Sequence, residues 1–338
     1  MNITLEAGLA QALARLLIPF GFAFVISALC APILIPLLRR LKFGQSIREI
    51  GPSWHQKKAG TPTMGGLIFI LGVTVATLLC VRDTAVTGVL LCALAYGAIG
   101  FIDDFIKVVL KRNLGLTALQ KLLLQIAAAV AFVVVLWRMG ILQTDILIPF
   151  TDVSWEMGWL FIPFAVFIIV GYTNAVNLTD GLDGLATSVT FVVSLFFTAG
   201  AFLYGNIQLA AFCIALTGGC LAFLLYNHYP AKVFMGDTGS LFLGGGITAA
   251  AILLKMPLIL VIAGIIYGAE ALSVMLQVLY FKLTGKRIFK MSPIHHHFEM
   301  SGWNEVKIVI VFCVVSLIAC VISLLAIWPG LPGVVTGW

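Results

Sequence analysis

The sequence predicts an all-α polytopic integral membrane protein, a single domain of ten transmembrane helices over residues 1–338. Hydrophobic residues make up 61% of the chain and charged residues only 10%, whereas a soluble domain is about 25% charged. Mean hydropathy is +1.11. The apolar residues form long continuous runs, not the alternating strands of a membrane β-barrel. This composition excludes a soluble enzyme, a disordered protein and a nucleic-acid-binding domain.

Ten apolar runs approach the roughly 20 residues that a helix needs to cross a bilayer. They cover residues 16–38, 64–81, 86–102, 118–137, 158–175, 185–204, 208–226, 239–254, 257–281 and 306–328. The ninth run is longer than a span requires and contains Gly264, Gly268 and Glu270, so we expect a break or a strong tilt there. The segment between the fourth and fifth runs, residues 140–157, is long enough for a short hairpin or an interfacial segment.

The distribution of cations predicts the orientation, because cytoplasmic loops are enriched in Lys and Arg. The odd-numbered loops contain Arg39, Arg40, Lys42, Arg48, Lys57, Lys58, Lys107, Lys111, Arg112, Lys232, Lys282, Lys286, Arg287 and Lys290. The opposite side contains Arg15, Arg82, Arg138 and Lys255. The odd loops are therefore predicted to be cytoplasmic and both termini to lie outside. The net charge of +6 is interpreted as membrane topology.

Polar residues gather on this cytoplasmic side. It contains all five histidines and eight of the fourteen acidic residues: Glu49, Asp103, Asp104, Asp180, Asp183, Asp237, Glu299 and Glu305. Several of them adjoin the ends of spans, where a charge placed in the membrane costs roughly 2.5–3.5 kcal/mol on insertion scales. Carboxylates and cations on one side indicate a site for a metal and a phosphorylated substrate at the inner membrane surface.

Asp103 and Asp104 directly follow the third apolar run. Adjacent carboxylates in a low dielectric resist joint ionisation unless a cation is present. This favours metal or phosphate chemistry, with one carboxylate as a base. The alternative is a solvated acidic pair that marks the membrane edge.

Two further acidic loops precede predicted helices. Asp180 and Asp183 lie in a turn with Asn177 before the sixth run, and Asp237 lies between glycines before the eighth. Helix N-capping is the alternative for each Asp. Capping explains only one residue of the Asp180–Asp183 pair, so we expect this loop to bind a nucleoside. Asp is also a suitable oxygen ligand for Mg²⁺ beside substrate phosphates, and the nearby Phe234 could stack on a base.

His295, His296 and His297 suggest zinc at first sight. Consecutive side chains point in different directions, however, and the chain has no HExxH or CxxC motif to complete a zinc site. We therefore expect these histidines to hydrogen-bond phosphate or to assist proton transfer. In the first inner loop, Lys57 and Lys58 could neutralise phosphate, with Thr61 near the substrate. The alternative for these lysines is topological charge alone.

Taken together, five stretches resemble the phospho-N-acetylmuramoyl-pentapeptide transferase (MraY) family of the polyprenyl-phosphate N-acetylhexosamine-1-phosphate transferase superfamily. They are HQKKAGTPTMGG, FIDDFIK, NAVNLTDGLDGLA, NHYPAKVFMGDTGSLFLGG and MSPIHHHFE, in the order expected of the family. The HHHFE element points to the muramoyl-pentapeptide branch. The resemblance covers the chain from the first inner loop to the tenth run.

The resemblance implies transfer of phospho-MurNAc-pentapeptide from UDP onto undecaprenyl phosphate, giving lipid I and UMP. It also implies a requirement for Mg²⁺, a ten-helix fold in the bacterial cytoplasmic membrane and a homodimer. Asp237 then resembles the Mg²⁺ ligand, with Asn177 and Asp180 as supporting polar groups, and Asp103 and Asp104 resemble the catalytic pair, with Asp103 deprotonating the lipid phosphate. The implied phosphate contacts are Lys57, His295 and His296, and the implied nucleoside pocket is Gly181, Leu182, Asp183, Asn227, Phe234 and Gln277.

Two other functions stay open on the sequence. A secondary transporter would place polar residues near the bilayer midplane in repeated halves, whereas here only Glu270 is clearly intramembrane. A sister transferase would use a different UDP-sugar. A direct displacement and a covalent route through Asp103 or Asp104 are equally compatible with the sequence.

Overall fold

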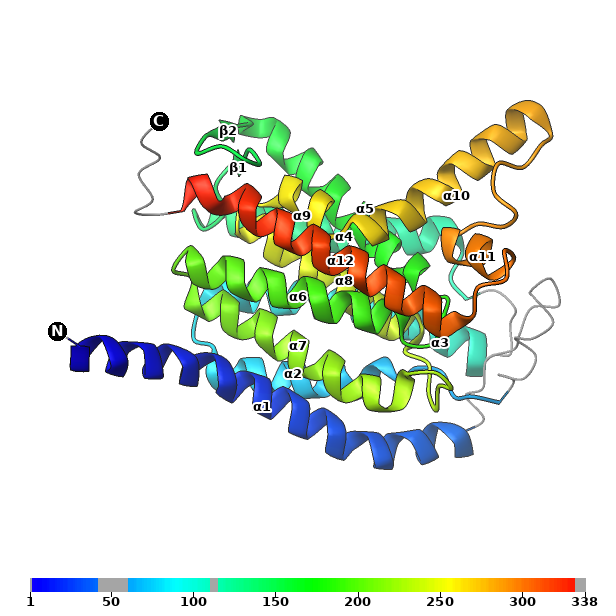
Figure 1. The fold of residues 1–338 in the computed structure, drawn as a ribbon, viewed down its shortest axis with the longest axis horizontal. Helices are drawn as coiled ribbons and strands as arrows, with labels where there is room; N and C mark the ends of the chain where they lie inside the picture. The colour runs from blue at the N-terminus through cyan, green and yellow to red at the C-terminus, as the bar shows by residue number, and fades with distance from the viewer. Residues whose placement is uncertain (1, 42–59, 110–114, 332–338) are drawn as a thin grey trace.

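The computed structural model describes residues 2–41, 60–109 and 115–331. The long helices are α1 (Asn2–Arg40), α2 (Gly66–Cys80), α3 (Thr84–Val109), α4 (Ala118–Arg138), α5 (Phe161–Thr179), α6 (Leu185–Leu203), α7 (Ile207–Asn227), α8 (Gly236–Leu253), α10 (Ile265–Thr284) and α12 (Glu305–Ile327). Two shorter helices, α9 (Pro257–Ala263) and α11 (Ile294–Glu299), and two 3-10 turns, η2 (Gly158–Leu160) and η3 (Trp328–Gly330), complete the helical part. Most long helices run side by side in one bundle (Figure 1).

Helix α8 is the centre of the bundle. Its residues from Thr238 to Ile252 are all buried, and it packs mainly against α3 and α5. Glycines permit this close packing, because a Cβ at Gly244 would press on Thr173 of α5. A Cβ at Gly245 would likewise press on Tyr96 of α3. Small residues let apolar helices approach where lipid offers no hydrophobic driving force.

The membrane character of the fold is confirmed. Eight of the described helices are long and apolar enough to cross a bilayer: α1, α3, α4, α5, α6, α7, α10 and α12. Helix α2 is apolar but has only 15 residues, and α8 is enclosed by its neighbours. Ten spans therefore remain a prediction, although each predicted run coincides with helix in the structure.

The third run extends further than the sequence predicts. The run ends at residue 102, but α3 continues to Val109. Asp103, Asp104 and Lys107 thus lie on the last turns of a helix and have fixed directions in space. A loop would not hold them in this way.

The ninth run is broken, as its glycines predict. Helix α9 ends at Ala263, Gly264 is the junction, and α10 begins at Ile265. From this break α10 extends away from the other helices (Figure 1). From its second turn onward α10 exposes large apolar side chains, among them Leu272, Met275 and Leu283. An apolar surface of this size indicates contact with a membrane or a partner.

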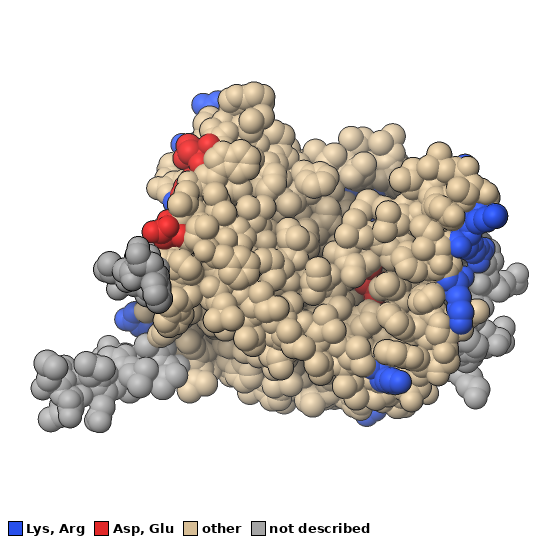
Figure 2. Space-filling view, turned by 45° about the horizontal axis from the view of Figure 1, so that its top comes forward, with Lys and Arg blue, Asp and Glu red and all other residues tan. Residues whose placement is uncertain are grey.

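The segment between α4 and α5 forms a hairpin, one of the two structures expected for it. Strand β1 (Asp145–Leu147) pairs antiparallel with β2 (Ser154–Glu156). Helix α1 begins and η3 ends at this same end of the bundle, whereas the C-terminal end of α3 and helix α11 lie at the opposite end (Figure 1). Figure 2 shows most of its visible Lys and Arg at the α11 end and most of its visible Asp and Glu at the hairpin end.

Candidate active site

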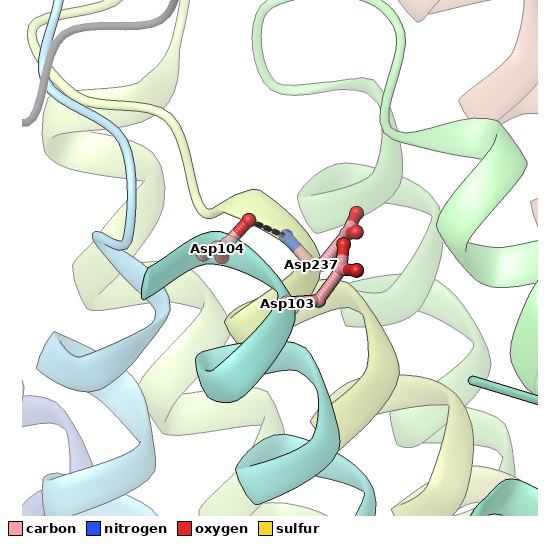
Figure 3. A group of neighbouring side chains, drawn as sticks. All are labelled: Asp103, Asp104 and Asp237. Atoms are coloured by element: carbon pink, nitrogen blue, oxygen red, sulfur yellow. Dashed lines mark hydrogen bonds between the residues drawn. The ribbon is translucent and has the colours of Figure 1, made fainter. Parts of the chain in front are cut away.

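Three aspartates meet where α3 crosses the start of α8. The two backbones are so close at Gly100 that a Cβ there would collide with the Asp237 carbonyl. Asp103, Asp104 and Asp237 each offer one oxygen, and these oxygens lie within 4.8 Å of one another (Figure 3). In the described part of the chain, this is the one group of three or more acidic, His or Cys residues close enough to share a metal ion.

Asp104 caps the N-terminus of α8. Its Oδ1 accepts from the Asp237 N–H at 3.2 Å, and its Oδ2 accepts from the Thr238 N–H at 2.9 Å and from the Thr238 hydroxyl at 2.7 Å. The residue at the N-cap position, Met235, provides no side-chain cap. The first amides of a helix need acceptors, and a negative charge at this end is favourable. Asp104 is thus turned toward α8, while the carboxylates of Asp103 and Asp237 lie side by side (Figure 3).

The carboxylate of Asp237 is held by three donors from three other helices. Its Oδ2 accepts from Lys107 Nζ at 2.8 Å and from Lys121 Nζ at 2.9 Å. Its Oδ1 accepts from the Asn177 side-chain N–H at 2.8 Å, and the same nitrogen lies 2.8 Å from Ser240 Oγ. Asp237 is in the first turn of α8 but makes no capping bond there. The capping hypothesis for Asp237 is therefore wrong.

The charge of Asp237 is stabilised by these surroundings. Burial alone would raise the pKa of its carboxyl group, but the positive charges of Lys121 and Lys107 and the hydrogen bond from Lys107 oppose this effect. The pKa of Asp237 is consequently held below its ordinary value. This carboxylate remains ionised and available to a cation across the neutral range.

Asp103 shares the same two cations. It is buried, and its Oδ2 lies 2.5 Å from Lys107 Nζ and 3.8 Å from Lys121 Nζ. Its Oδ1 accepts from the Leu116 N–H at 2.8 Å, which ties the chain before α4 to α3. The sequence pattern assigned Lys107 to topological charge and gave Lys121 no role. The spacing of four between Asp103 and Lys107 could have identified one of them, whereas no local pattern points to Lys121.

A reciprocal amide pair fixes α4 against α5. The Asn174 side-chain N–H donates to Gln125 Oε1 at 2.7 Å, and the Gln125 side-chain N–H donates to Asn174 Oδ1 at 3.3 Å. Gln125 is one turn from Lys121, and Asn174 is one turn from Asn177. This pair therefore sets the register in which Lys121 and Asn177 both reach Asp237.

The loop after α5 does not cap α6. The N-cap position of α6 is Gly184, with φ of 77° and no side-chain capping bond, so the capping alternative for Asp180 and Asp183 is wrong. Asp183 Oδ2 accepts from the Ala231 N–H at 2.9 Å, and the Asp183 N–H donates to Glu305 at 2.6 Å. These bonds attach the loop to the segment before α8 and to α12.

Asp180 is half-buried in this loop, and within the described residues its carboxylate has no hydrogen-bond or ion-pair partner. Burial raises the pKa of Asp180 well above its ordinary value. The negative charges of Asp237, Asp104 and Asp183 add to this effect. Asp180 thus carries an unfavourable charge that a bound cation would relieve.

The other candidate substrate contacts divide into loop anchors and accessible groups. Asn227 accepts from the Thr187 hydroxyl at 2.8 Å and donates to the Val233 carbonyl at 2.9 Å. Gln277 binds the backbone of Ile288 and Phe289, each at 3.0 Å. Leu182 is buried, whereas Phe234 and Thr61 are partly exposed. Lys57 and Lys58 lie outside the described residues.

The three histidines of α11 have three different partners, as their consecutive positions predict. Nδ1 of His295 lies 3.0 Å from Glu270 Oε1, and Nδ1 of His296 lies 2.6 Å from Glu299 Oε2. Nδ1 of His297 instead accepts from the Lys290 N–H at 3.2 Å. The ring of His295 lies against Gly181, so α11 adjoins the loop that carries Asp180.

Comparison with known proteins identifies this membrane protein as a transferase. The family model described as glycosyl transferase family 4 matches residues 86–255, which include all three clustered aspartates. Residues 58–70 match signature 1 of phospho-N-acetylmuramoyl-pentapeptide-transferase.

Curated relatives carry the same name. The phospho-N-acetylmuramoyl-pentapeptide-transferase of Acetivibrio thermocellus is 53% identical over 312 residues, 91% of this chain and 94% of its own length. That of Clostridium kluyveri is 53% identical over 308 residues, 90% of this chain and 97% of its own. That of Thermoanaerobacter sp. is 52% identical over 312 residues, 92% of this chain and 98% of its own. The chain therefore belongs to the phospho-N-acetylmuramoyl-pentapeptide-transferase family.

The raised pKa of Asp180 predicts a pH-dependent gain in stability from Asp180→Asn. A carboxyl group whose pKa is higher in the folded state favours folding at low pH, and this stability is lost as the pH rises through the folded value. In metal-free buffer, the variant should unfold at a higher temperature than the parent, by on the order of 2–4 °C at pH 8. The difference should shrink toward pH 4, near the ordinary value.

Thermal unfolding in detergent with a chelator measures this difference. Asp152→Asn, on the exposed hairpin, is the matched control and should leave the midpoint unchanged at every pH. A variant of Asp180 that is less stable than the parent at pH 8 would contradict the interpretation.

Proposed function

We propose that this chain transfers phospho-MurNAc-pentapeptide from UDP-MurNAc-pentapeptide to undecaprenyl phosphate, the first membrane step of peptidoglycan synthesis. The products are lipid I and UMP. Membership of the family supports the reaction, and one observation carries the chemistry: Asp103 and Asp237 face each other and share Lys107 and Lys121. The whole chain acts as one transmembrane transferase domain, and we propose a homodimer.

The donor set fits Mg²⁺. Three carboxylates within 4.8 Å of one another offer the hard oxygen atoms that this ion prefers beside substrate phosphates. Asp237 would hold the ion, and Asn177 would support it by fixing Asp237 Oδ1. When bound, Mg²⁺ would offset the charge of the pyrophosphate and stabilise the UMP leaving group.

The residues of this chain supply the rest of the mechanism. An oxygen of the lipid phosphate attacks the phosphorus that bears the sugar, and the bond from this phosphorus to the oxygen of UMP breaks. Asp103 accepts the proton of the lipid phosphate. Its carboxylate lies beside that of Asp237 (Figure 3) and within ion-pair distance of Lys107 and Lys121. Lys107 and Lys121 offset the charge that builds on the phosphates. Asp104 has both oxygens engaged by α8, so it positions Asp237 rather than reacting.

The substrate is held from the surrounding loops. His295, His296 and His297, with Lys57 and Lys58, contact the phosphates and the sugar. The uridine lies among Gly181, Leu182, Asp183, Asn227, Phe234 and Gln277, with Phe234 stacked on the base and Thr61 and Asp180 at the sugar side.

The acceptor reaches the site from the membrane. The lipid phosphate stays in the bilayer, and Figure 2 shows a hollow with an acidic side chain at its floor in a flank otherwise nearly free of charged residues. The cations at the α11 end support a cytoplasmic site, with both termini outside and the protein in the bacterial cytoplasmic membrane. A transporter is the less suitable alternative, because the acidic cluster lies at one end of the bundle.

Release of UMP by the purified protein tests the reaction. Activity should require UDP-MurNAc-pentapeptide, undecaprenyl phosphate and Mg²⁺ together. Asp237→Asn keeps the shape but removes the charge, and should lower kcat by on the order of 100-fold or more, while Asp152→Asn should leave it unchanged. Near-normal activity of folded Asp237→Asn would contradict the metal role. Equal or faster turnover of UDP-N-acetylglucosamine would favour the sister transferase.

The proposed orientation of the protein in the membrane, with the aspartates on the cytoplasmic side, predicts which sealed vesicles release UMP. A nucleotide sugar added outside reaches a cytoplasmic site only in inside-out vesicles. These vesicles should therefore release UMP at once, and right-side-out vesicles only after detergent opens them. The opposite pattern would place the aspartates on the outer face.

A further inference from the structure

Glu270 is a buried carboxylate that the proposed mechanism does not use. It lies in the second turn of α10 and has no exposed surface. Its Oε1 is 3.0 Å from Nδ1 of His295, which is itself buried and belongs to α11. Burying an ionisable group among apolar helices costs free energy, so a buried carboxylate with a specific partner indicates a functional role.

One polar atom of each side chain has no partner. Among the described residues, Glu270 Oε2 and His295 Nε2 are buried and make no hydrogen bond. Buried polar atoms in proteins are nearly always satisfied, and exceptions point to a ligand, an ion or a water. Each of these two atoms therefore has an unused hydrogen-bonding capacity that a further polar group could satisfy.

The unpaired Nε2 of His295 faces the substrate loop, the segment of residues 180–184 that connects α5 to α6. A Cβ at Gly181 would collide with Nε2 and Cε1 of the His295 ring, so the glycine is needed for this approach. Gly181 follows Asp180, and this loop continues directly from α5, whose last turn carries Asn177, which holds Asp237. A group bound at Nε2 would therefore lie between α11 and the acidic cluster.

His296, like His295, has a glutamate as the partner of its Nδ1. His296 directs Nδ1 to Glu299 at 2.6 Å, and its ring lies 4.1 Å, centroid to centroid, from that of His295. His297 differs, because its Nδ1 accepts from a backbone N–H. Two histidines are thus oriented by a glutamate and one by the backbone.

We propose that Glu270 is a positioning residue that fixes the tautomer and direction of His295. The carboxylate accepts from Nδ1–H, which leaves Nε2 directed at the loop of Gly181. Carboxylate partners orient imidazoles in this way in metal and catalytic sites. In this tautomer Nε2 is an acceptor, directed toward a donor group of the bound nucleotide sugar such as a sugar hydroxyl. This assignment rests on the proposed function.

Kinetic coupling tests whether Glu270 acts through His295. Glu270→Gln keeps the size and one acceptor oxygen but removes the charge, and should lower kcat/KM for the nucleotide sugar by about 10- to 100-fold. In a His295→Ala background, the same substitution should have no further effect. Ser273→Ala, one turn along α10 and buried, is the matched control and should keep parental activity. Independent, multiplicative losses in the double variant would overturn the proposal.

A substrate-free measurement separates this proposal from the function itself. In protein labelled with ¹⁵N-histidine, His295 should have its proton on Nδ1 in the neutral form, as assigned by comparison with His295→Ala. Glu270→Ala should remove this tautomer preference. An unchanged His295 signal in folded Glu270→Ala would overturn the positioning role whatever the substrate, whereas absence of UMP release by the parent protein would contradict only the reaction.

Discussion

The requirement to neutralise buried negative charge at one end of an apolar bundle governs this structure. Three aspartates lie within 4.8 Å of one another, and such a cluster is stable only if each carboxylate has strong partners. Asp104 is satisfied by the N-terminal amides of α8. Asp103 and Asp237 are satisfied by Lys107 and Lys121. The N-terminal amides of α8 and the two lysines thus stabilise the three carboxylates, and the cluster can still bind a cation.

The packing of the bundle follows from this requirement. The donors come from α3, α4, α5 and α8, so these four helices must meet at one depth. Gly100 lets α3 approach the start of α8, and the Gln125–Asn174 pair sets α4 against α5. Elements outside this centre are less constrained, and α10 leaves the bundle at Gly264. Its buried Glu270 nevertheless links α10 to His295 and so to the substrate loop.

Periodic and local features were predictable from the sequence, and long-range partners were not. The apolar runs predicted the helices, and the glycines of the ninth run predicted the break at Gly264. The motifs identified the three aspartates that the structure brings together. Capping was the wrong hypothesis for Asp237, because the side chain that caps α8 is Asp104, 133 residues before Asp237. It was also wrong for the Asp180–Asp183 loop, because the N-cap position of α6 is Gly184 and has no side-chain cap. Lys121 and Glu270 were not assigned roles, since their partners come from other helices and no spacing along the chain reveals them.

The proposed mechanism depends most on a divalent cation at Asp237, beside Asp103 and the two lysines. Anomalous diffraction from crystals grown with Mn²⁺ and a uridine nucleotide tests it most directly. We expect an anomalous peak bonded to a carboxylate oxygen of Asp237, at about 2.1 Å, with Lys107 or Lys121 turned toward the nucleotide phosphates. A peak bound at α11, or an Asp237 that still accepts from both lysines with no metal beside it, would rule out this metal site.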